Sequence, residues 1–345
     1  MKIFLTGGTG FIGKPLTDRL LKRGWEVTAL VRRPENDESK LIQTLGAQLI
    51  RGDVTDKESM RSAMSAVDVV IHNAGWYEFG ILQKDHDQMY KINVEGTQNT
   101  LSLAFELGIP KIIYTSSILA FGRTGQIIAD EAYVRQFPPL TYYEETKMNA
   151  HEIAVGLQKI GAPIMIVCPA GVIGPGDHSG IGCLVRMYVR RCLPPILWTP
   201  NGRLAHVYVD DAAEAIARCV EYGKIGEVYI LSNGNQAHRE MSDDWKKCEG
   251  GCKTTWFWLP NPIAVLLNRL AEPVERFLGI PIVFCKEFIF SAKENWQFTA
   301  AKAEQDLHMH FRSLEKAWCD TIAGERILIQ KKKTKKYQHQ KINPN

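Results

Sequence analysis

Three glycines follow an apolar segment near the start of the chain and precede an amphipathic one. Gly7, Gly10 and Gly13 lie between the apolar residues 2–6 and a leucine-rich segment that ends at Gly24. Gly7 permits a tight turn after a strand, Gly10 lets the backbone approach a ligand closely, and Gly13 allows the next helix to pack against the strand. The positive end of that helix then faces phosphate groups. The segment therefore predicts a strand, a glycine-rich loop and a helix that together bind a dinucleotide.

Short apolar segments alternate with longer amphipathic ones as far as residue 167. We expect strands at residues 26–31, 46–51, 67–72, 111–115 and 164–167, and helices at residues 57–65, 87–107 and 143–160. This alternation predicts an α/β fold, a Rossmann-type doubly wound parallel sheet with helices on both faces. Ligands of such sheets bind beyond the carboxyl ends of the strands.

The alternation weakens after residue 171, where prolines, tryptophans and longer irregular segments begin. We assign residues 1–171 to the dinucleotide-binding domain, with returns of the chain near residues 206–231. Residues 172–205 and 232–323 then form a smaller, discontinuous C-terminal substrate lobe. We expect residues 324–345 to be a basic and disordered tail.

Positive charge is concentrated at the C-terminus. The last fifteen residues contain six lysines and no acidic residue, whereas the formal net charge of the whole chain is only +4. The remainder is slightly acidic, which argues against nucleic-acid binding. No secretory signal precedes the first strand, and the uncharged segment 254–268 is shorter than a membrane span of about twenty residues. We expect a cytoplasmic protein without stable membrane insertion, whose tail is solvated or contacts anionic lipid or RNA.

The eight cysteines show no pairing pattern along the chain. Cys248 and Cys252 are separated by three residues, but no second Cys/His pair at zinc spacing accompanies them. We therefore expect free thiols and no metal site.

Two arginines follow the second expected strand, where an NAD site normally has an acid. Arg32 and Arg33 could bind the 2′-phosphate of NADP through charge and bidentate geometry. The alternative is that both only solvate a loop. We favour NADP over NAD.

An aspartate follows the third expected strand. Asp53, with Val54 beside it, is placed to accept a hydrogen bond from an adenine amino group. It could instead cap the next helix, although Asp56 is better placed for that.

A tyrosine and a lysine lie four residues apart near the start of an expected helix. Tyr143 and Lys147 project from one face, so the ammonium would lower the pKa of the phenol and make it a proton donor or acceptor. Ser116 and Ser117 end the preceding strand, where a hydroxyl could orient the same substrate oxygen for hydride transfer.

Six motifs occur in the order typical of the extended short-chain dehydrogenase/reductase family, which the chain resembles over residues 1–322. The motifs are TGGTGFIG at 6–13, GDV at 52–54, NVEGT at 93–97, YTSS at 114–117, YxxxK at 143–147 and HVYVDD at 206–211. Residues 30–34 and 113–118 resemble the branch with dihydroflavonol reductases, 3β-hydroxysteroid dehydrogenases and NAD-dependent epimerase/dehydratases. The HNAG sequence at 72–75 is closer to the classical short-chain form.

The resemblance implies a catalytic role for four residues. Tyr143 would be the acid/base, Lys147 would hold the nicotinamide ribose and Ser117 would bind the substrate oxygen. Asn93 would anchor a water relay or brace the active-site helix; the alternative is a helix-bending polar residue without such a role. The cofactor contacts that it implies are Gly7, Thr9, Gly10, Phe11, Ile12, Gly13, Arg32, Arg33, Asp53, Val54, Asn73, Ala74, Gly75, Thr115, Tyr143, Lys147, Pro169 and Val172.

The activity that we expect is NADPH-dependent reduction of a ketone or aldehyde on a small, fairly apolar substrate. Trp76, Tyr77 and Phe79 would supply aromatic surface near that substrate or simply pack the lobe interface. A nucleotide-sugar epimerase is the alternative, since it needs the same tyrosine. A dehydratase is disfavoured because no acid pair follows Ser117, and a non-catalytic regulator is disfavoured because Ser117, Tyr143 and Lys147 are all present. Members of this family often form homodimers.

Overall fold

The computed structural model describes residues 1–248, 257–278 and 285–342, and seven parallel strands form its large sheet. The strands lie in the order β10-β6-β5-β4-β1-β2-β3, and every neighbouring pair in this order is parallel. Their bounds are β1 (Lys2–Thr6), β2 (Glu26–Val31), β3 (Gln48–Arg51), β4 (Val69–His72), β5 (Lys111–Thr115), β6 (Ile164–Pro169) and β10 (Val228–Leu231). The inner strands β1, β4, β5 and β6 are apolar and buried on both faces, as a parallel sheet requires, whereas the edge strand β3 is only partly buried.

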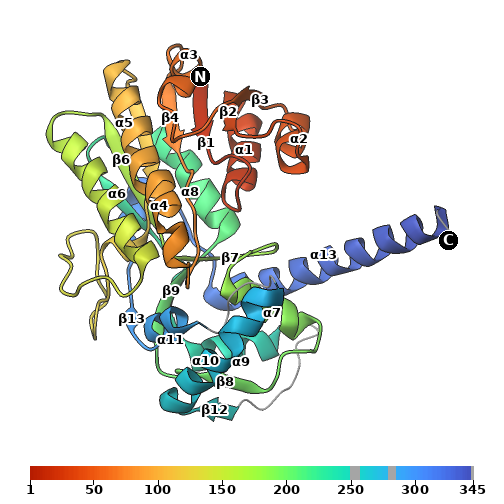
Figure 1. The fold of residues 1–345 in the computed structure, drawn as a ribbon. Helices are drawn as coiled ribbons and strands as arrows, with labels where there is room; N and C mark the ends of the chain where they lie inside the picture. The colour runs from red at the N-terminus through yellow and green to blue at the C-terminus, as the bar shows by residue number, and fades with distance from the viewer. Residues whose placement is uncertain (249–256, 279–284, 343–345) are drawn as a thin grey trace.

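Helices cover both faces of this sheet (Figure 1). Helix α5 packs against α3 and α6, whereas α1 packs against α2 and α8, so the two groups form separate layers. Their bounds are α1 (Gly13–Lys22), α2 (Asp37–Thr44), α3 (Glu58–Met64), α4 (His86–Tyr90), α5 (Gly96–Glu106), α6 (Tyr142–Lys159) and α8 (Val209–Tyr222). Short helical turns are η1 (Gln83–Asp85), η2 (Lys91–Glu95) and η3 (Ile118–Ala120). The Rossmann-type fold class predicted from the sequence is confirmed.

The remaining elements build a smaller lobe at the carboxyl end of the large sheet (Figure 1). It has a four-stranded sheet, in which β9 pairs with each of β7, β11 and β13. Strands β8 and β12 form a separate two-stranded sheet. The strands are β7 (Gly171–Ile173), β8 (Ile196–Trp198), β9 (Arg203–Tyr208), β11 (Gly234–Ala237), β12 (Phe257–Leu259) and β13 (Asn295–Trp296). The helices are α7 (Gly180–Val189), α9 (His238–Lys247), α10 (Asn261–Leu278), α11 (Lys286–Ala292), α12 (Ala301–Asp306) and α13 (Leu314–Ile342).

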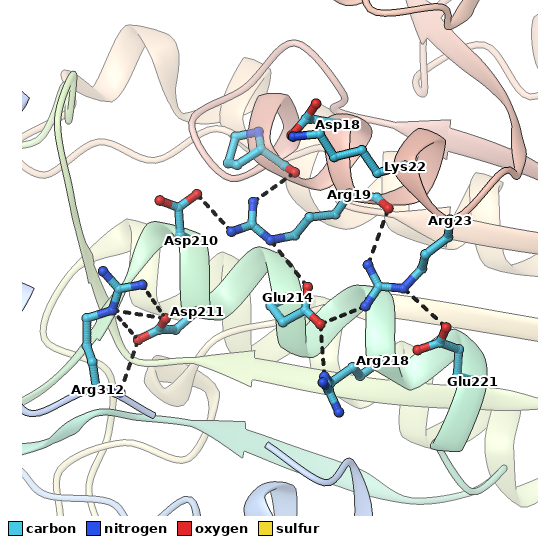
Figure 2. Close-up of polar contacts among 11 residues, drawn as sticks. Asp18, Arg19, Lys22, Arg23, Asp210, Asp211, Glu214, Arg218, Glu221 and Arg312 are labelled. Carbon is cyan, nitrogen blue, oxygen red and sulfur yellow. Dashed lines mark hydrogen bonds and ion pairs between the residues drawn. The ribbon is translucent and has the colours of Figure 1, made fainter. Parts of the chain in front are cut away.

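Helix α8 joins the glycine-loop helix to the rest of the molecule through ion pairs (Figure 2). Arg19 of α1 lies 3.1 Å from Asp210 and 3.4 Å from Glu214. At the start of α8, Asp211 pairs with Arg312 at 2.8 Å. The HVYVDD motif therefore has a structural role in this chain, because its second aspartate ties α8 to the segment before α13.

A disulfide joins Cys248 at the end of α9 to Cys319 in α13. The prediction that all thiols are free is wrong for this pair, and Cys252 lies outside the described residues. The two cysteines are 71 residues apart in sequence, but α9 and α13 pack side by side and bring their Cα atoms within 4.9 Å. Cys168, Cys192 and Cys219 remain thiols, and of these only Cys192 is exposed.

The C-terminal segment forms a helix that projects from the body (Figure 1). Helix α13 runs from Leu314 to Ile342, which differs from the disordered tail expected from residue 324. Glu325 is 2% exposed and accepts a hydrogen bond from the backbone nitrogen of Gly176 at 2.7 Å. The first turns of α13 are therefore packed in the lobe, and the lysine-rich sequence beyond them has a high helix propensity that continues the helix. Within the described ranges, no helix has both the length and the apolar character to cross a bilayer.

Candidate active site

A cavity of about 420 Å³ lies where the carboxyl ends of the large sheet meet the lobe. We call its two sides the sheet half and the lobe half. The sheet half is lined by Gly10, Phe11, Ile12, Asn73, Ala74, Gly75, Thr115, Ser116, Ser117, Tyr143, Lys147, Pro169 and Val172. The lobe half includes Ile181, Leu184, Leu197, Trp198, His238, Met241 and Phe288. Most of the predicted cofactor and catalytic residues therefore meet in one cavity.

The glycine-rich loop has the geometry that its sequence predicts. Gly7 has a φ of +71°, and a Cβ atom there would lie 2.6 Å from the backbone of Asn73 and Ala74. A Cβ atom on Gly13 would overlap the carbonyl oxygen of Gly7. Gly10 closes the turn by donating from its nitrogen to that oxygen at 3.0 Å, immediately before α1 begins at Gly13. The loop therefore requires glycine at positions 7 and 13, and it brings Gly10, Phe11 and Ile12 to the cavity at the N-terminus of α1.

A buried hydrogen-bond network fixes the loop after β4 against the loop after β1. The hydroxyl of Thr6 accepts from the backbone nitrogens of Asn73 and Ala74, both at 3.2 Å, and bonds to His72 Nδ1 at 2.8 Å. The other ring nitrogen of His72 bonds to Thr97 at 3.1 Å. Burial lowers the pKa of His72 to about 3, so this ring stays neutral at ordinary pH.

Asn93 braces the active-site helix rather than lining the cavity. Its side-chain oxygen accepts from the nitrogen of Trp76 at 2.7 Å, and its amide donates to the carbonyl of Trp76 at 3.0 Å and to Thr146 at 3.1 Å. Asn93 lies in the π-helical turn η2, and Thr146 lies in α6 between Tyr143 and Lys147. Of the roles expected for Asn93, these contacts fit the bracing one.

The two serines after β5 have different environments. Ser116 is buried, and its hydroxyl bonds to His151 Nδ1 at 2.9 Å. The Ser117 side chain caps η3 by accepting from the nitrogen of Leu119 at 3.2 Å, which leaves its hydroxyl proton available. Both residues line the cavity, but Ser117 is the more accessible hydroxyl.

Tyr143 and Lys147 lie in the first turns of α6, which Thr141 caps through the nitrogen of Glu144. Lys147 is buried, and its ammonium lies 3.5 Å from the carbonyl oxygen of Thr115. Burial lowers the pKa of Lys147 to about 8, and it raises the pKa of the Tyr143 phenol above its ordinary value. The expected lowering of the tyrosine pKa is therefore wrong for this structure, because burial disfavours the charged phenolate. A phenol that keeps its proton can donate it to an oxygen in the cavity.

Four residues predicted to bind the adenosine end lie away from the cavity, beyond β2 and β3. Arg32 and Arg33 are exposed and follow β2, which pairs with β1 and so ends beside the glycine-rich loop. One carboxylate oxygen of Asp53 accepts from the nitrogen and hydroxyl of Thr55, both at 2.9 Å. Val54 is buried against α5. Asp56 accepts from the nitrogen of Ser59 at 3.3 Å, so it assists the start of α3 as expected.

Aromatic residues after β4 enclose the catalytic tyrosine candidate. The rings of Tyr77 and Phe79 lie 5.0 Å and 5.9 Å from that of Tyr143, in edge-on arrangements. Both line the cavity together with Trp76, so the predicted aromatic surface and the packing alternative hold at once.

The lobe half contains residues that the sequence did not reveal. Leu184, Leu197, Met241 and Phe288 come from four separate elements, α7, β8, α9 and α11. Apolar residues in those elements are indistinguishable in sequence from other core residues. Only the turn at Asp177 carries a local signal, since its carboxylate accepts from the nitrogen of Ser179 at 2.8 Å at the start of α7.

Known proteins similar in sequence and in structure agree with a dinucleotide site at the carboxyl end of the large sheet. A sequence model of the NAD dependent epimerase/dehydratase family matches residues 3–232. The chain belongs to this family. It is an NAD(P)-dependent oxidoreductase of the extended short-chain dehydrogenase/reductase type, whose relatives include reductases, dehydrogenases and epimerases.

Two relatives of known name align with most of the length of this chain. The putative dihydroflavonol 4-reductase of Synechocystis sp. is 31% identical over 333 residues, which is 92% of this chain and 93% of that protein. A 4-hydroxy-2-methyl-3-oxo-4-farnesyl-3,4-dihydroquinoline-1-oxide ketoreductase of Stigmatella aurantiaca is 29% identical over 68% of this chain and 69% of that protein.

Solved structures show the same fold over most of this chain. The crystal structure of gox2253 matches with a TM-score of 0.77 and 29% identity, covering 94% of this chain and 97% of that one. The UDP-glucose 4-epimerase of Thermus thermophilus, solved in complex with NAD, has a TM-score of 0.73 at 21% identity, covering 94% and 99%. The second likeness extends to the fold alone.

The sheet half fits the dinucleotide that the family binds. The glycine-rich loop borders this half through Gly10, Phe11 and Ile12, next to the N-terminus of α1. Two buried oxygens at the cavity, Asn73 Oδ1 and Thr115 Oγ1, have no hydrogen-bond partner among the described residues. Such oxygens lose free energy unless a ligand or water satisfies them, so they are suited to polar groups of a bound cofactor.

Proposed function

We propose that this enzyme reduces a ketone or aldehyde of a small, fairly apolar molecule, with NADPH as the hydride donor. The observation that carries the proposal is the meeting of Ser117, Tyr143 and Lys147 in a cavity whose lobe half is mainly apolar. When bound, NADPH supplies the hydride. The protein's own residues must then orient the carbonyl oxygen and give it a proton.

Tyr143 is the proton donor in this proposal. Its phenol is protonated over the ordinary pH range because burial raises its pKa, and it faces the cavity beside Ser117. The Ser117 hydroxyl donates a hydrogen bond to the same substrate oxygen, which holds the carbonyl carbon in place for hydride transfer. The Lys147 ammonium stabilises the phenolate left after the proton has moved.

The glycine-rich loop and the loops after β4, β5 and β6 hold the cofactor in the proposal. Gly7, Thr9, Gly10, Phe11, Ile12 and Gly13 bind its pyrophosphate side, while Asn73, Ala74, Gly75, Thr115, Pro169 and Val172 bind its nicotinamide side. Arg32 and Arg33 bind the 2′-phosphate and make NADP the preferred form, with Asp53 and Val54 at the adenine. Asn93 acts as a positioning residue through Trp76 and Thr146.

The substrate that fits the lobe half is apolar. Leu184, Leu197, Trp198, Met241 and Phe288 contribute carbon surface to the cavity. Two relatives, one named a putative dihydroflavonol 4-reductase and one named a ketoreductase of a farnesylated dihydroquinoline oxide, act on ring compounds according to their names. They support reduction of a ring-bearing or chain-bearing carbonyl compound here.

A nucleotide-sugar epimerase, the alternative from the sequence, fits less well. Its substrate carries a diphosphate, which arginine or lysine side chains usually bind. Lys147 is the only lysine or arginine among the described residues that line the cavity.

The test is an NADPH oxidation screen against aldehydes, flavonoid and steroid ketones and nucleotide sugars. We expect turnover with an apolar carbonyl compound, and a loss of about a hundredfold to ten-thousandfold in kcat for Tyr143→Phe. The matched control is Tyr142→Phe, since Tyr142 stacks on His86 outside the cavity and should leave kcat nearly unchanged. Turnover of a nucleotide sugar alone, or an active Tyr143→Phe variant, would overturn the proposal.

A further inference from the structure

Helix α10 has an apolar stripe that faces away from the protein. The stripe residues are spaced three or four apart and are exposed by 47%, 59%, 45%, 68%, 56% and 90% in the order Ile263, Leu266, Leu267, Leu270, Val274 and Phe277. This spacing places them on one face of the helix. Ala264, which is 4% exposed, and the half-buried Val265 hold the helix against the lobe. Most of the large apolar side chains of α10 therefore face the solvent, whereas those of an ordinary amphipathic helix face the protein core.

Ammonium groups border the stripe on the neighbouring helix. An open apolar groove of about 460 Å³ runs between α10 and α11, and it is lined by both Leu266 and Lys293. The ammonium groups of Lys286 and Lys293 lie 5.4 Å and 5.1 Å from the ring of Phe290. Lys293 is also 3.7 Å from the carboxylate of Glu294, a distance at which the ammonium is only weakly paired.

A second source of positive charge is the C-terminal helix. Lysines occupy positions 331, 332, 333, 335, 336 and 341 without an acidic residue among them. Helix α13 carries this segment out of the body of the protein (Figure 1). Clustered lysines are attracted to anionic lipid surfaces by about 1 kcal/mol for each charge near the surface.

Two partners could cover an apolar stripe of this kind, a second copy of the chain or a lipid surface. Specific dimers usually bury about 20–30 residues on each side, whereas the stripe consists of six side chains on one helix. A single helix with an apolar face and nearby lysines matches the pattern of helices that lie in a membrane interface. Size and charge both favour the lipid surface.

We propose that the stripe of α10 inserts into the surface of an anionic phospholipid bilayer, with Lys286 and Lys293 of α11 at the lipid headgroups. The lysine-rich C-terminal sequence adds to the electrostatic attraction. The enzyme is then a peripheral protein that lies on the bilayer and does not span it. Helix α11 packs against α10 and also lines the active-site cavity through Phe288, Ser291 and Ala292. Docking through α10 therefore sets the lobe half of the cavity next to the bilayer.

The experiment is flotation of the full chain with vesicles. We expect it to float with vesicles of equimolar phosphatidylcholine and phosphatidylglycerol, to float less with phosphatidylcholine alone, and to be released by salt. Combining Leu270→Glu with Phe277→Glu should weaken vesicle binding at least tenfold, a change that corresponds to about 1.4 kcal/mol. The matched control is Ile160→Glu, because Ile160 is 67% exposed at the end of α6 and lies outside the stripe.

Two further measurements keep the outcome decisive. Thermal unfolding must show that the double variant is folded, which we expect because both side chains are exposed. Light scattering gives the oligomeric state of the wild type and the double variant. The proposal fails if the wild type does not bind the anionic vesicles, if Ile160→Glu weakens binding as much as the double variant, or if the double variant instead converts a dimer to a monomer.

Discussion

The two halves of the cavity are built in different ways. The sheet half is made of backbone turns and short side chains that follow strand ends, and its hydrogen bonds run through Thr6, His72 and Thr97. The lobe half is made largely of apolar side chains from several separate elements, among them Trp198 and Phe288. Backbone geometry tolerates little change, whereas an apolar surface tolerates exchange of similar volumes. The comparison teaches that a site built from backbone turns is fixed by the fold, whereas the shape of an apolar surface is set by side chains that can be exchanged.

The sheet half should be the less tolerant, and Gly13→Ala tests this most severely. The new methyl group would overlap the carbonyl oxygen of Gly7, so the loop must move. We expect a loss of about 3 kcal/mol or more in the free energy of unfolding, and loss of NADPH binding. Denaturant unfolding and calorimetry measure the two effects.

Gly156→Ala is the matched control, since a Cβ atom on this glycine in α6 would meet no atom within 4 Å. It should raise the free energy of unfolding by about 0.5–1 kcal/mol. If Gly13→Ala behaved in the same way, the rigid character of the sheet half would be disproved.

Acid should destabilise the protein through two buried histidines, His72 in β4 of the large sheet and His206 in β9 of the lobe. Burial lowers the pKa values of His72 and His206 from 6.5 to about 3, so the folded protein leaves both rings neutral while the unfolded chain takes up protons below 6.5. The free energy of unfolding should therefore fall as the pH drops from 6.5 towards 3. By pH 5 each ring should account for about 2 kcal/mol.

Unfolding titrations of His206→Gln at several pH values check this slope. The variant should lose less stability between pH 6.5 and pH 5 than the wild type. Equal slopes for the two proteins would contradict the prediction.

Phe288→Ala should alter substrate binding without altering cofactor binding. Phe288 is half-buried in the lobe half, and its ring meets Phe79 edge-on at 6.1 Å. Removing this surface should raise KM for an apolar carbonyl substrate by about tenfold. The Kd for NADPH, measured by fluorescence titration, should stay the same; a change in both constants would show that the two halves are not separable.

The smallest effect should come from the exposed edge of the sheet half. Arg32→Ser should raise the Kd for NADPH by about fivefold and leave that for NADH unchanged, because an exposed charge pair contributes only about 1 kcal/mol. Calorimetry of the wild type and the variant with NADPH and with NADH measures both Kd values. Parallel changes for NADPH and NADH would remove the argument for a 2′-phosphate site.

Much of the sheet half could be predicted because its signals are local. Strands β2 and β5 have the predicted bounds, since an apolar run with defined ends is enough to specify a buried parallel strand. Helix α2 was missed, although Asn36 caps it through the nitrogen of Ser39 and Asp37 follows in its first turn. That signal was present in the sequence but is short, as is the helix.

The lobe depended on contacts between distant parts of the chain. The disulfide between Cys248 and Cys319 requires α9 and α13 to lie side by side, and the spacing of the cysteines in the sequence does not predict this pairing. The direction of the pKa shift of Tyr143 likewise depends on how deeply α6 is buried. Burial and long-range proximity are properties of the assembled protein.

By itself, the sequence determined the parallel strands of the large sheet, the glycine-rich loop and the spacing of Tyr143 and Lys147 on one helix, because each is set by neighbours a few positions away. The tertiary structure decided what surrounds them: an apolar lobe half, a protonated Tyr143 and an apolar stripe on α10 that points outward. The physical reason is that local conformation follows local sequence, whereas the water that a group loses or keeps depends on every segment packed around it.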